Sequence, residues 1–594
     1  MELKSRAEMD PRYTWDLTPI FESDDVWEAA LKNAAETVDK LSKLPGTLDE
    51  SVESFKAGLD AVFAASEQME KLYCYAYLRK SGDNGDPVSQ DMEARCIGLM
   101  TRFQAVVSFL NPEILAMDPG KLAAYMGDAR MATYRHLIDD ICRARSHTLD
   151  AEREKMLAML SDAVQTPSNV YDMFESVDMT FEPVTGENGE ELPLTHGSFA
   201  VFRESRSREL RREAFEKYFG AFEKFINTIS AMYAGSVKFD CYFADVRGYS
   251  SACEAALFGN NVPVSLYDNL VATVSGGLDT MKRYLDLRKR VLAVDELHLY
   301  DLYVPIVDDI NFDMPYDKAC KLVREALKPL GEEYGRLLDR AFAERWIDVY
   351  ENKGKTTGAY SMGVYGAHPY VLLNHADTLD SAFTLAHELG HALHSFHSDA
   401  ARDYVNHDYC IFVAEVASTV NEVLLTKYLL KTETDPKRRA YILNHFLEGF
   451  RTTVFRQTQF AEFERKSHEM HQSGIPLTAE SLNRIYRELN AKYYEGVALD
   501  DYTDCEWARI PHFYRAFYVY QYSTGFCSAV TIADRILNHG GAEDYLRFLS
   551  TGGSDYPIEE LKIAGVDLTK PDALESAMRV FAETMDEMEQ AIER

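Results

Sequence analysis

The sequence predicts a mainly α-helical fold, and three observations support this. Only 19 prolines and 32 glycines occur among 594 residues, so long stretches carry no turn signal. Along several of these stretches apolar residues recur at intervals of three and four, which is the period of an α-helix. Strand-like patterns occur in only two short regions. We therefore expect a large helical body with a small β-region.

Four stretches carry the helical pattern most clearly: 59–78, 86–109, 205–225 and 318–344. The second opens with Asp86-Pro87, an N-cap residue followed by a proline, which helices accept in their first turn. The third places glutamates three or four residues from lysines and arginines, a spacing that stabilises a helix surface. The charges along these stretches are most simply explained as solvated helix faces.

Two regions have strand-like patterns. FEPVTGENGEELPLTHGSF (181–199) is typical of a hairpin with its turn at Glu187-Asn188-Gly189. TTGAYSMGVYGAHPYVLLNHAD (356–377) is rich in aromatic and β-branched residues, which favour extended backbone, and glycines punctuate it. The hairpin region marks a boundary, so we expect an N-terminal helical lobe at 1–195 and a second region at 196–594.

Charge and cysteine content limit the kinds of partner and compartment. The net charge is −33 and the isoelectric point is about 4.9, which argues against nucleic acid or an anionic membrane as a partner. The nine cysteines are scattered without CxxC spacing, so a disulfide framework is not expected and a reducing cytoplasm fits best. The charged N-terminus does not resemble a signal peptide, and no apolar run is long enough to span a bilayer.

The segment TLAHELGHALHSFHS (384–398) contains the pattern His-Glu-x-x-His. On a helix, His387 and His391 project from one face about one turn apart, so both imidazoles can reach a single zinc ion. Glu388 is rotated by roughly 100° from His387, so it misses the metal but can act as a general base on a water molecule there. Asp377-Thr378 provides a helix start just before the motif.

A catalytic zinc site needs a third protein ligand, and two residues compete for that role. His397 stands where one zinc class has its third histidine, but that class needs a glycine at the position of His394 to turn the chain back. Without that glycine the helix continues, and His397 points away from the ligand face. Glu415 is a single carboxylate in an apolar helical run, which is costly to bury unless it is paired or coordinates a metal. We therefore expect Glu415 to be the third ligand.

Two neighbours of these ligands have other roles. Glu422 lies seven residues after Glu415 on the same helix face, so it either orients a ligand from behind or is a surface glutamate. His394 shares the face of His387 but lies roughly 10 Å from it along the helix axis. A straight helix cannot bring it to the same ion, so we expect a structural or substrate-side role.

A second cluster of polar aromatic residues lies in RIPHFYRAFYVYQYSTGF (509–526). A water molecule that attacks a carbonyl creates an oxyanion, which hydrogen-bond donors must face. Tyr514, Tyr518 and Tyr522 are spaced by four and would line one face of a helix, and His512 precedes them after a proline. The stripe is either an aromatic core or a set of donors, and the neighbouring histidine favours donors.

Taken together, these segments resemble the oligoendopeptidase F group of the thimet oligopeptidase-like family of zinc metallopeptidases. The resemblance spans nearly the whole chain. The segments that carry it are WDLTPIFES, GAYSMGVYGAHPYVLLN, FTLAHELGHALHS, FVAEVASTVNE and IPHFYRAFYVYQYSTGF. It implies a largely helical body with a deep channel that encloses the zinc site and admits short peptides but not whole proteins.

The resemblance also implies roles for individual residues. The expected ligands of one Zn²⁺ per chain are His387, His391 and Glu415. Glu388 is the expected general base. His512, Tyr518 and Tyr522 are expected to donate to the substrate carbonyl and oxyanion, although Gly525 stands where relatives have a further tyrosine.

Three further residues are candidates for binding substrate. The family suggests that the extended segment 358–374, which contains His368 and Asn374, pairs with the substrate backbone. Such pairing binds peptides without reading their side chains. Tyr514, in the aromatic cluster, is the third candidate.

The sequence thus predicts a cytoplasmic zinc endopeptidase that cleaves internal bonds of short peptides, with its catalytic region at 196–594. Glu388 takes a proton from water and passes it to the leaving amine. The alternative from a different class is a non-catalytic helical peptide-binding protein with a structural zinc site, which needs four protein ligands. A carboxypeptidase variant of the same family is a third possibility.

Overall fold

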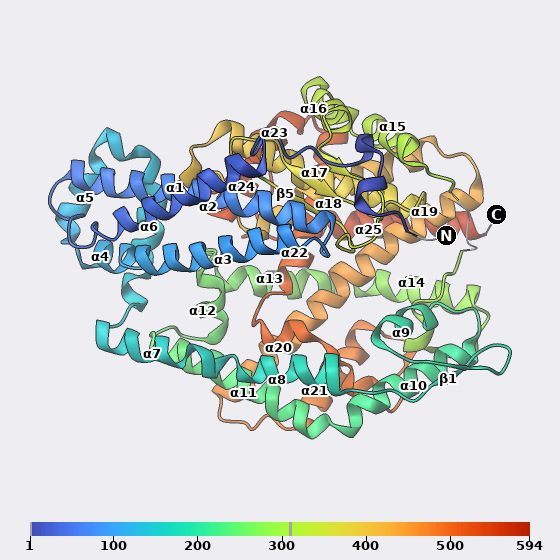
Figure 1. Ribbon diagram of the computed structural model, residues 1–594. Helices are drawn as coiled ribbons and strands as arrows, with labels where there is room; N and C mark the ends of the chain where they lie inside the picture. Colours follow the sequence, from blue (N-terminus) through green and yellow to red (C-terminus); the bar gives the residue numbers. More distant parts are fainter. Residues whose placement is uncertain (1–2, 308–311, 594) are drawn as a thin grey trace. The chain divides into compact units, whose positions relative to one another are not determined.

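The computed structural model describes residues 3–307 and 312–593 and is mainly helical with a few short strands, as predicted (Figure 1). Its contacts divide the chain into two compact units, each assembled from three segments. Unit 1 consists of the described residues within 1–146, 311–428 and 532–566, and unit 2 of those within 147–310, 429–531 and 567–594. The boundary expected at residue 195 divides the sequence in another way and stays a prediction.

Unit 1 combines N-terminal helices with the helices and strands that follow residue 311. Its helices are α1 (Asp24–Leu41), α2 (Val52–Gly82), α3 (Pro87–Val107), α4 (Leu110–Ala116), α5 (Pro119–Gly127), α6 (Arg135–Arg143), α15 (Tyr316–Ala326), α16 (Glu332–Ala343), α17 (Leu379–Ala401), most of α18 (Ile411–Thr432), α23 (Ala542–Leu549) and α24 (Pro557–Ile563). Its strands are β4 (Ile347–Asp348), β5 (Tyr360–Met362) and β6 (Tyr370–Leu372). They form one sheet in the order β4-β6-β5, so β5 is an edge strand.

The helices predicted near the N-terminus are present, and their ends follow from local chemistry. At the start of α3 the side chain of Asp86 accepts hydrogen bonds from the backbone N–H groups of Val88 and Ser89, and Pro87 occupies the first turn. Helices α1, α2 and α3 pack around Trp27, which is fully buried. This core is therefore built from the apolar stripes that the sequence shows.

The helical pattern at 318–344 corresponds to two helices rather than to one. Helix α15 ends at Ala326, and a 3-10 turn at Lys328–Leu330 separates it from α16. Gly331 follows this turn with φ +94°, a conformation that glycine adopts without steric cost. The Pro329–Gly331 stretch was the turn signal in the sequence.

Helix α17 carries the His-Glu-x-x-His motif and begins where the sequence predicts. The side chain of Thr378 accepts a hydrogen bond from the backbone N–H of Ser381 at 3.2 Å, which caps the first turn. The helix then continues to Ala401 and passes His394 without interruption. The expectation that this helix does not turn back after His391 is confirmed.

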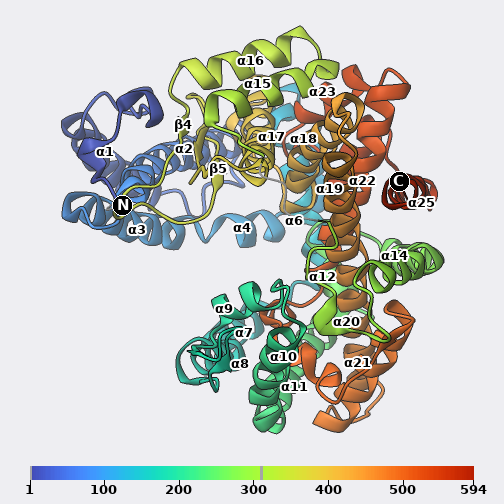
Figure 2. The same ribbon diagram turned by 90° about the vertical axis from the view of Figure 1, so that its right-hand side faces the viewer.

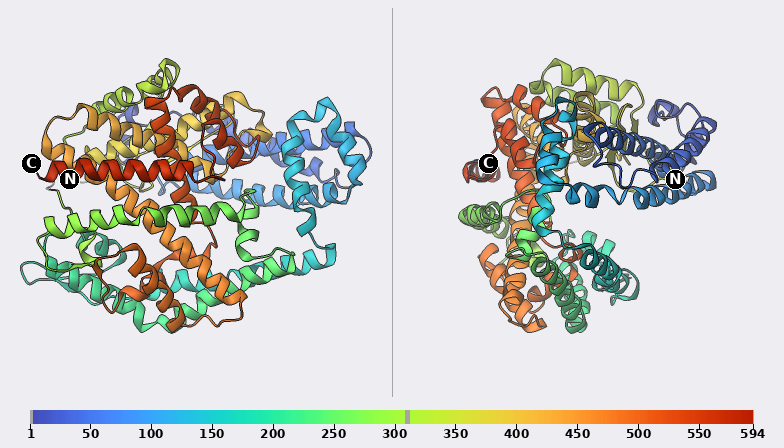
Figure 3. Two further views of the ribbon diagram at one scale, coloured as in Figure 1. Left: turned by 180° about the vertical axis from the view of Figure 1, so that it is seen from behind. Right: turned by 90° about the vertical axis from the view of Figure 1, so that its left-hand side faces the viewer.

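Unit 2 is almost entirely helical. Its helices are α7 (Ala151–Val164), α8 (Thr166–Met173), α9 (His196–Phe202), α10 (Arg208–Lys224), α11 (Ile226–Val246), α12 (Ala252–Phe258), α13 (Val264–Gly276), α14 (Leu278–Val291), α19 (Pro436–Gly449), α20 (Arg456–Gln472), α21 (Ala479–Tyr493), most of α22 (Tyr520–Asn538) and α25 (Asp572–Ile592). Helix α25, drawn in red, lies alongside α14, drawn in green, in both views of Figure 3. The described helices of the chain include none that is long and apolar enough to cross a membrane.

The hairpin predicted at 181–199 is confirmed within unit 2. Strands β1 (Val184–Thr185) and β2 (Glu191–Leu192) pair in antiparallel register, with Val184 opposite Leu192. Gly189 has φ +84° in the connecting turn, as the Asn-Gly signal indicates. A second pair, β3 (Leu297–His298) and β7 (Val497–Ala498), is parallel and is too short to leave a strand pattern in the sequence.

Candidate metal centre

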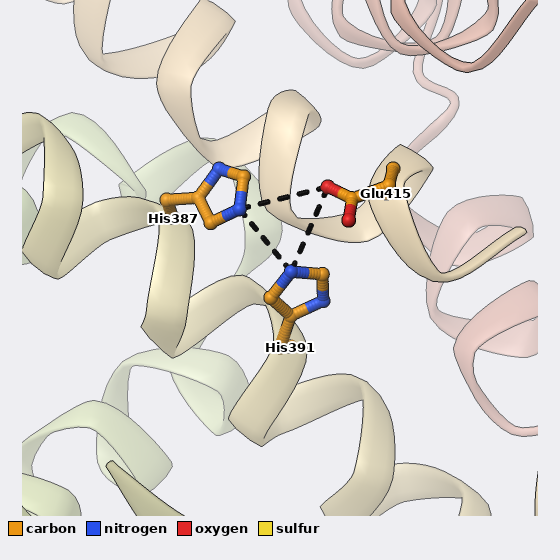
Figure 4. Close-up of side chains that lie close together, drawn as sticks. All are labelled: His387, His391 and Glu415. Atoms are coloured by element: carbon orange, nitrogen blue, oxygen red, sulfur yellow. Dashed lines mark hydrogen bonds and ion pairs between the residues drawn. The ribbon is translucent and has the colours of Figure 1, made fainter. Parts of the chain in front are cut away.

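Three side chains of unit 1 bring potential metal ligands together (Figure 4). His387 and His391 project from α17, and Glu415 projects from α18. The Nε2 atoms of the two histidines are 3.2 Å apart, and the Glu415 Oε2 atom lies 3.6 Å from His387 Nε2 and 3.8 Å from His391 Nε2. Tetrahedral ligands at about 2.0–2.1 Å from zinc are separated by about 3.3–3.4 Å. The three atoms therefore fit around one ion.

Glu415 reaches the histidines because α17 and α18, which are neighbours in Figure 2, approach each other very closely at Gly390. A Cβ atom at Gly390 would lie 2.5 Å from the Cα of Ser418 and 2.7 Å from the carbonyl oxygen of Ala417. Both are backbone atoms, so no side-chain rotation could relieve such a clash. Only glycine permits this crossing, in the middle of the motif that supplies the histidines.

A buried polar side chain ties the two helices together next to this crossing. The Asn421 side-chain N–H on α18 donates to the carbonyl of Ala386 on α17 at 3.0 Å. The Asn421 side-chain oxygen accepts a hydrogen bond from the Tyr334 hydroxyl at 3.1 Å. Asn421 is fully buried, so these bonds fix the rotation of α18 at the level of Glu415.

Glu422 contacts the first histidine from behind. Its carboxylate forms a short hydrogen bond with Nδ1 of His387, which leaves Nε2 to face Glu415. Burial lowers the pKa of His387, but the carboxylates of Glu422, Glu388 and Glu415 outweigh burial and raise it. A hydrogen bond to a carboxylate fixes the tautomer of a metal-binding histidine, so of the two readings of Glu422 the geometry supports the orienting one.

Glu388 is buried at the same level of the helix. Its side chain is 7 % exposed, and its Oε2 atom has no hydrogen-bond partner among the described residues. Burial, reinforced by Glu415 and Glu422, raises the pKa of Glu388 to about 7. The site thus gathers three carboxylates against two imidazoles, and a bound cation would offset their repulsion.

The remaining histidines of the segment lie away from the ligand group. His394 is fully buried and stacks on Tyr409, with ring centroids 3.6 Å apart, and neither of its ring nitrogens has a partner within the described chain. His397 lies with its ring parallel to that of Tyr334 at 6.3 Å. The cluster of possible metal ligands that the described residues form contains neither of them.

Within unit 2, three of the four expected donor residues gather in one cluster. The rings of His512 and Tyr518 are parallel with centroids 6.2 Å apart, and Tyr522 lies 6.2 Å from His512 and 5.4 Å from Tyr518. The Tyr522 hydroxyl donates to that of Tyr518 at 3.4 Å. Tyr514 instead stacks on Tyr171 at 4.6 Å, and its buried hydroxyl has no partner in the described part of the chain.

The prediction that Tyr514, Tyr518 and Tyr522 line one face of a single helix is wrong. Tyr514 ends a 3-10 turn at Pro511–Tyr514, and α22 begins only at Tyr520. Phe517 interrupts the helix with φ +54°, the left-handed region that a bulky residue enters only at a cost. Tyr514 therefore does not share a helix with Tyr522.

A buried carboxyl group stabilises the turn at Phe517. The Phe517 N–H donates to Oε1 of Glu464 on α20 at 3.0 Å, and the Phe517 ring packs 4.7 Å from that of His468. Glu464 is fully buried, and burial raises its pKa well above the usual range. Oε1 of Glu464 is thus the acceptor that holds the backbone next to Tyr518. No pattern in the sequence pointed to this pair.

The residues expected to bind substrate backbone lie around strand β5. His368 stacks on Trp346 with ring centroids 5.0 Å apart, and burial lowers its pKa. The Asn374 side chain donates to the carbonyls of Thr356 and Gly358 at 3.0 and 2.8 Å, so it shapes the segment that precedes β5. The two residues flank β6, the central strand of this sheet, and β5 is an edge strand of it.

The close approach of α17 and α18 at Gly390 predicts how substitutions there affect the thermal stability of the protein. Gly390→Ala should lower the midpoint of thermal unfolding, because backbone atoms must move apart at a cost of about 1–3 kcal/mol. Gly98→Ala is the matched control: Gly98 lies in the middle of α3 with nothing within 4 Å of an added Cβ, so this change should keep or raise the midpoint. Equal effects of the two substitutions, followed by circular dichroism, would contradict the close crossing.

Comparisons with known proteins identify the family. Residues 201–580 match the model of peptidase family M3, and residues 113–181 match that of oligopeptidase F. The chain is 42 % identical to oligopeptidase PepF of Bacillus subtilis, over 100 % of this chain and 89 % of that protein, and 40 % identical to group B oligopeptidase PepB of Streptococcus agalactiae, over 99 % and 98 %.

Solved structures show the same fold. A protein from Chlamydophila abortus superposes with a TM-score of 0.95 at 31 % identity, covering 99 % of this chain and 100 % of that one. Oligoendopeptidase-F from Enterococcus faecium gives 0.74 at 38 % identity, covering 96 % and 99 %. The fold, the relatives and the family model agree on a peptide-cleaving metallopeptidase. This chain therefore belongs to peptidase family M3 and carries that family's oligopeptidase F domain.

Proposed function

We propose that this protein is a zinc-dependent endopeptidase that hydrolyses internal bonds of short peptides. The observation that carries the proposal is that His387 Nε2, His391 Nε2 and Glu415 Oε2 converge on one point. The buried carboxyl group of Glu388 lies on α17, the helix that carries both histidines. Two imidazoles and one carboxylate form a known catalytic zinc set that leaves the fourth position for water or substrate. The relatives named as oligoendopeptidases point to the same activity.

The proposed mechanism assigns proton transfer to Glu388. His387, His391 and Glu415 would hold Zn²⁺, which would supply Lewis-acid chemistry to a peptide carbonyl and a water molecule. Glu388 takes the proton of the attacking water and delivers it to the departing amine. Its second oxygen has no competing partner among the described residues, so it is available for both steps. Glu422 holds His387 in the tautomer whose Nε2 is free to bind the metal.

The remaining proposed roles rest on the family resemblance. His512, Tyr518 and Tyr522 would donate hydrogen bonds to the substrate carbonyl and the oxyanion, and their clustering in unit 2 supports this. The edge strand β5, with His368 and Asn374 beside it, would pair with the peptide backbone. A substrate role for Tyr514 stays a prediction, since its hydroxyl is buried. All nine cysteines are free thiols, which supports a cytoplasmic enzyme.

Metal removal tests the activity itself. Treatment with a chelator should abolish cleavage of an internally quenched fluorogenic peptide, and added Zn²⁺ should restore it. Mass spectra of the products of a peptide of about nine residues should show cleavage between interior residues. Stepwise loss of single C-terminal residues would identify a carboxypeptidase instead, and bound zinc without chelator-sensitive cleavage would favour the non-catalytic alternative.

Substitution of Glu388 separates chemistry from metal binding. Glu388→Gln should retain zinc but lower kcat/KM by about 10²–10⁴-fold, because the amide cannot accept the proton. Glu422→Gln provides the contrast: it should weaken zinc binding by about 10–100-fold and recover activity when zinc is in excess. Zinc content by atomic emission and steady-state kinetics measure both. Full activity of Glu388→Gln would exclude it as the base.

The third ligand is tested by a pair of substitutions. Glu415→Ala should lose zinc, because two imidazoles alone hold the ion weakly. His397→Ala should keep one zinc per chain, since its ring packs near Tyr334 and outside the ligand group. Zinc stoichiometry after dialysis against a weak chelator distinguishes the two. Loss of zinc from the His397 variant and retention in the Glu415 variant would reverse the assignment.

A further inference from the structure

Unit 2 contains a small, largely apolar cavity with an unusual number of arginines. Its volume is about 20 Å³, enough for one water molecule or an ion of similar size. Buried aromatic and aliphatic side chains form most of its wall, including Phe199 and Phe219. The charged residues that line it are Arg203, Arg456, Arg509 and Glu506. It thus has three cations and one anion around a space for a single small particle.

The one carboxylate at the cavity is already fully engaged. Oε1 of Glu506 pairs with the guanidinium of Arg456, and Oε2 accepts the hydroxyl of Tyr486 at 2.9 Å. Glu506 is 7 % exposed. Its single negative charge neutralises the guanidinium of Arg456. Arg509 lies close enough to feel its charge but makes no ion pair with it within the described chain.

Within the described residues, Arg203 and Arg509 form no ion pair with a carboxylate, and both are partly exposed. The buried Nε atoms of Arg203 and Arg509 donate to no acceptor among residues 3–307 and 312–593. Arg203 lies over the ring of Tyr303, with its guanidinium carbon 3.8 Å from the ring centroid. The neighbouring Glu204 is exposed; burial, Arg509 and Arg456 lower the pKa of Arg203 more than Tyr303 and Glu204 raise it. Ring stacking returns only part of the cost of removing such a cation from water.

The carboxylate that pairs with the adjacent arginines has no negative charge to spare for the cavity. Arg451 approaches the same Tyr303 ring at 4.5 Å, and its own partner Glu448 is shared with Arg288. One terminal nitrogen of Arg451 is buried and without an acceptor in the described chain. Positive charge thus exceeds negative charge throughout this interior, although the chain as a whole carries −33.

A guanidinium group cannot escape burial by releasing its proton. Among the described residues that line the cavity, three arginines face one carboxylate, and a bound anion or an ionised protein group would offset this excess of positive charge. We propose that this cavity binds a single small monovalent anion of chloride size, held by Arg203 and Arg509 beside the Tyr303 side chain. The site is separate from the metal ligands, which belong to unit 1, and does not depend on the proposed peptidase activity.

Tyr303 is the competing source of negative charge. Burial raises its pKa, but Arg456, Arg451 and Arg203 outweigh burial and the repulsion of Glu506 and lower the pKa to about 8. Its other charged or titratable neighbours are Arg509, across the cavity, and Tyr494. A bound anion would raise the pKa of Tyr303 again, because it adds negative charge next to the phenol. The two sources of negative charge therefore predict different responses to chloride.

Chloride titration of the purified full-length protein tests the proposal. At pH 7 and constant ionic strength, replacing sodium gluconate with sodium chloride should raise the thermal midpoint saturably and broaden the ³⁵Cl resonance above the bulk value. Arg203→Gln should lose both effects. Arg212→Gln is the matched control, because Arg212 is exposed and pairs with Glu209, and it should keep both.

Two further measurements distinguish loss of anion binding in Arg203→Gln from a folding defect of this variant. In chloride-free buffer Arg203→Gln should be at least as stable as the parent, since it removes one of the three positive charges that line the cavity, and the order should reverse in chloride. The parent-minus-Tyr303→Phe absorbance difference at 295 nm should titrate at higher pH in chloride than in gluconate. No saturable chloride response in the parent, or the same response in Arg203→Gln, would overturn the proposal and leave Tyr303 as the counter-charge.

Discussion

The close crossing of α17 and α18 at Gly390 is the constraint on which the metal centre depends. One helix supplies two imidazoles, but a straight helix cannot also supply a third ligand at the same point. Glu415 comes from the second helix, and its reach is short, so the backbones must nearly touch. The absence of a side chain at Gly390 permits this, and the bond from Asn421 to the Ala386 carbonyl fixes the angle. Packing and ligation are therefore decided by the same few residues.

This crossing also concentrates negative charge. Glu388, Glu415 and Glu422 lie around His387, and burial raises the pKa of Glu388 while these carboxylates raise that of His387. Such an arrangement is unfavourable for an apolar interior and suited to a divalent cation. Unit 2 shows the opposite imbalance, since arginines outnumber carboxylates around its small cavity. In each unit the unbalanced charge of the described residues would favour a bound ion of the opposite sign.

Much of the fold and of the candidate site could be predicted from the sequence, because helical period and motif spacing are local properties. They give the helix through His387 and His391, its continuation past His394, and Glu415 as a lone carboxylate in an apolar run. Tyr514 shows the limit: its spacing from Tyr518 suggested one helix, but Phe517 adopts a left-handed conformation held by Glu464, 53 residues earlier. Likewise, the need for glycine at Gly390 arises from Ser418, on another helix. Long-range contacts of this kind leave no periodic signal.

The central claim is that one zinc ion lies between α17 and α18 at His387, His391 and Glu415. Anomalous diffraction from crystals of the zinc-loaded protein, recorded on both sides of the zinc absorption edge, tests it most directly. One peak should appear within about 2.0–2.2 Å of His387 Nε2, His391 Nε2 and a Glu415 oxygen. A peak elsewhere, for example at the partly buried group of His407, Asp399 and Glu70, with none at His387, His391 and Glu415, would contradict the account.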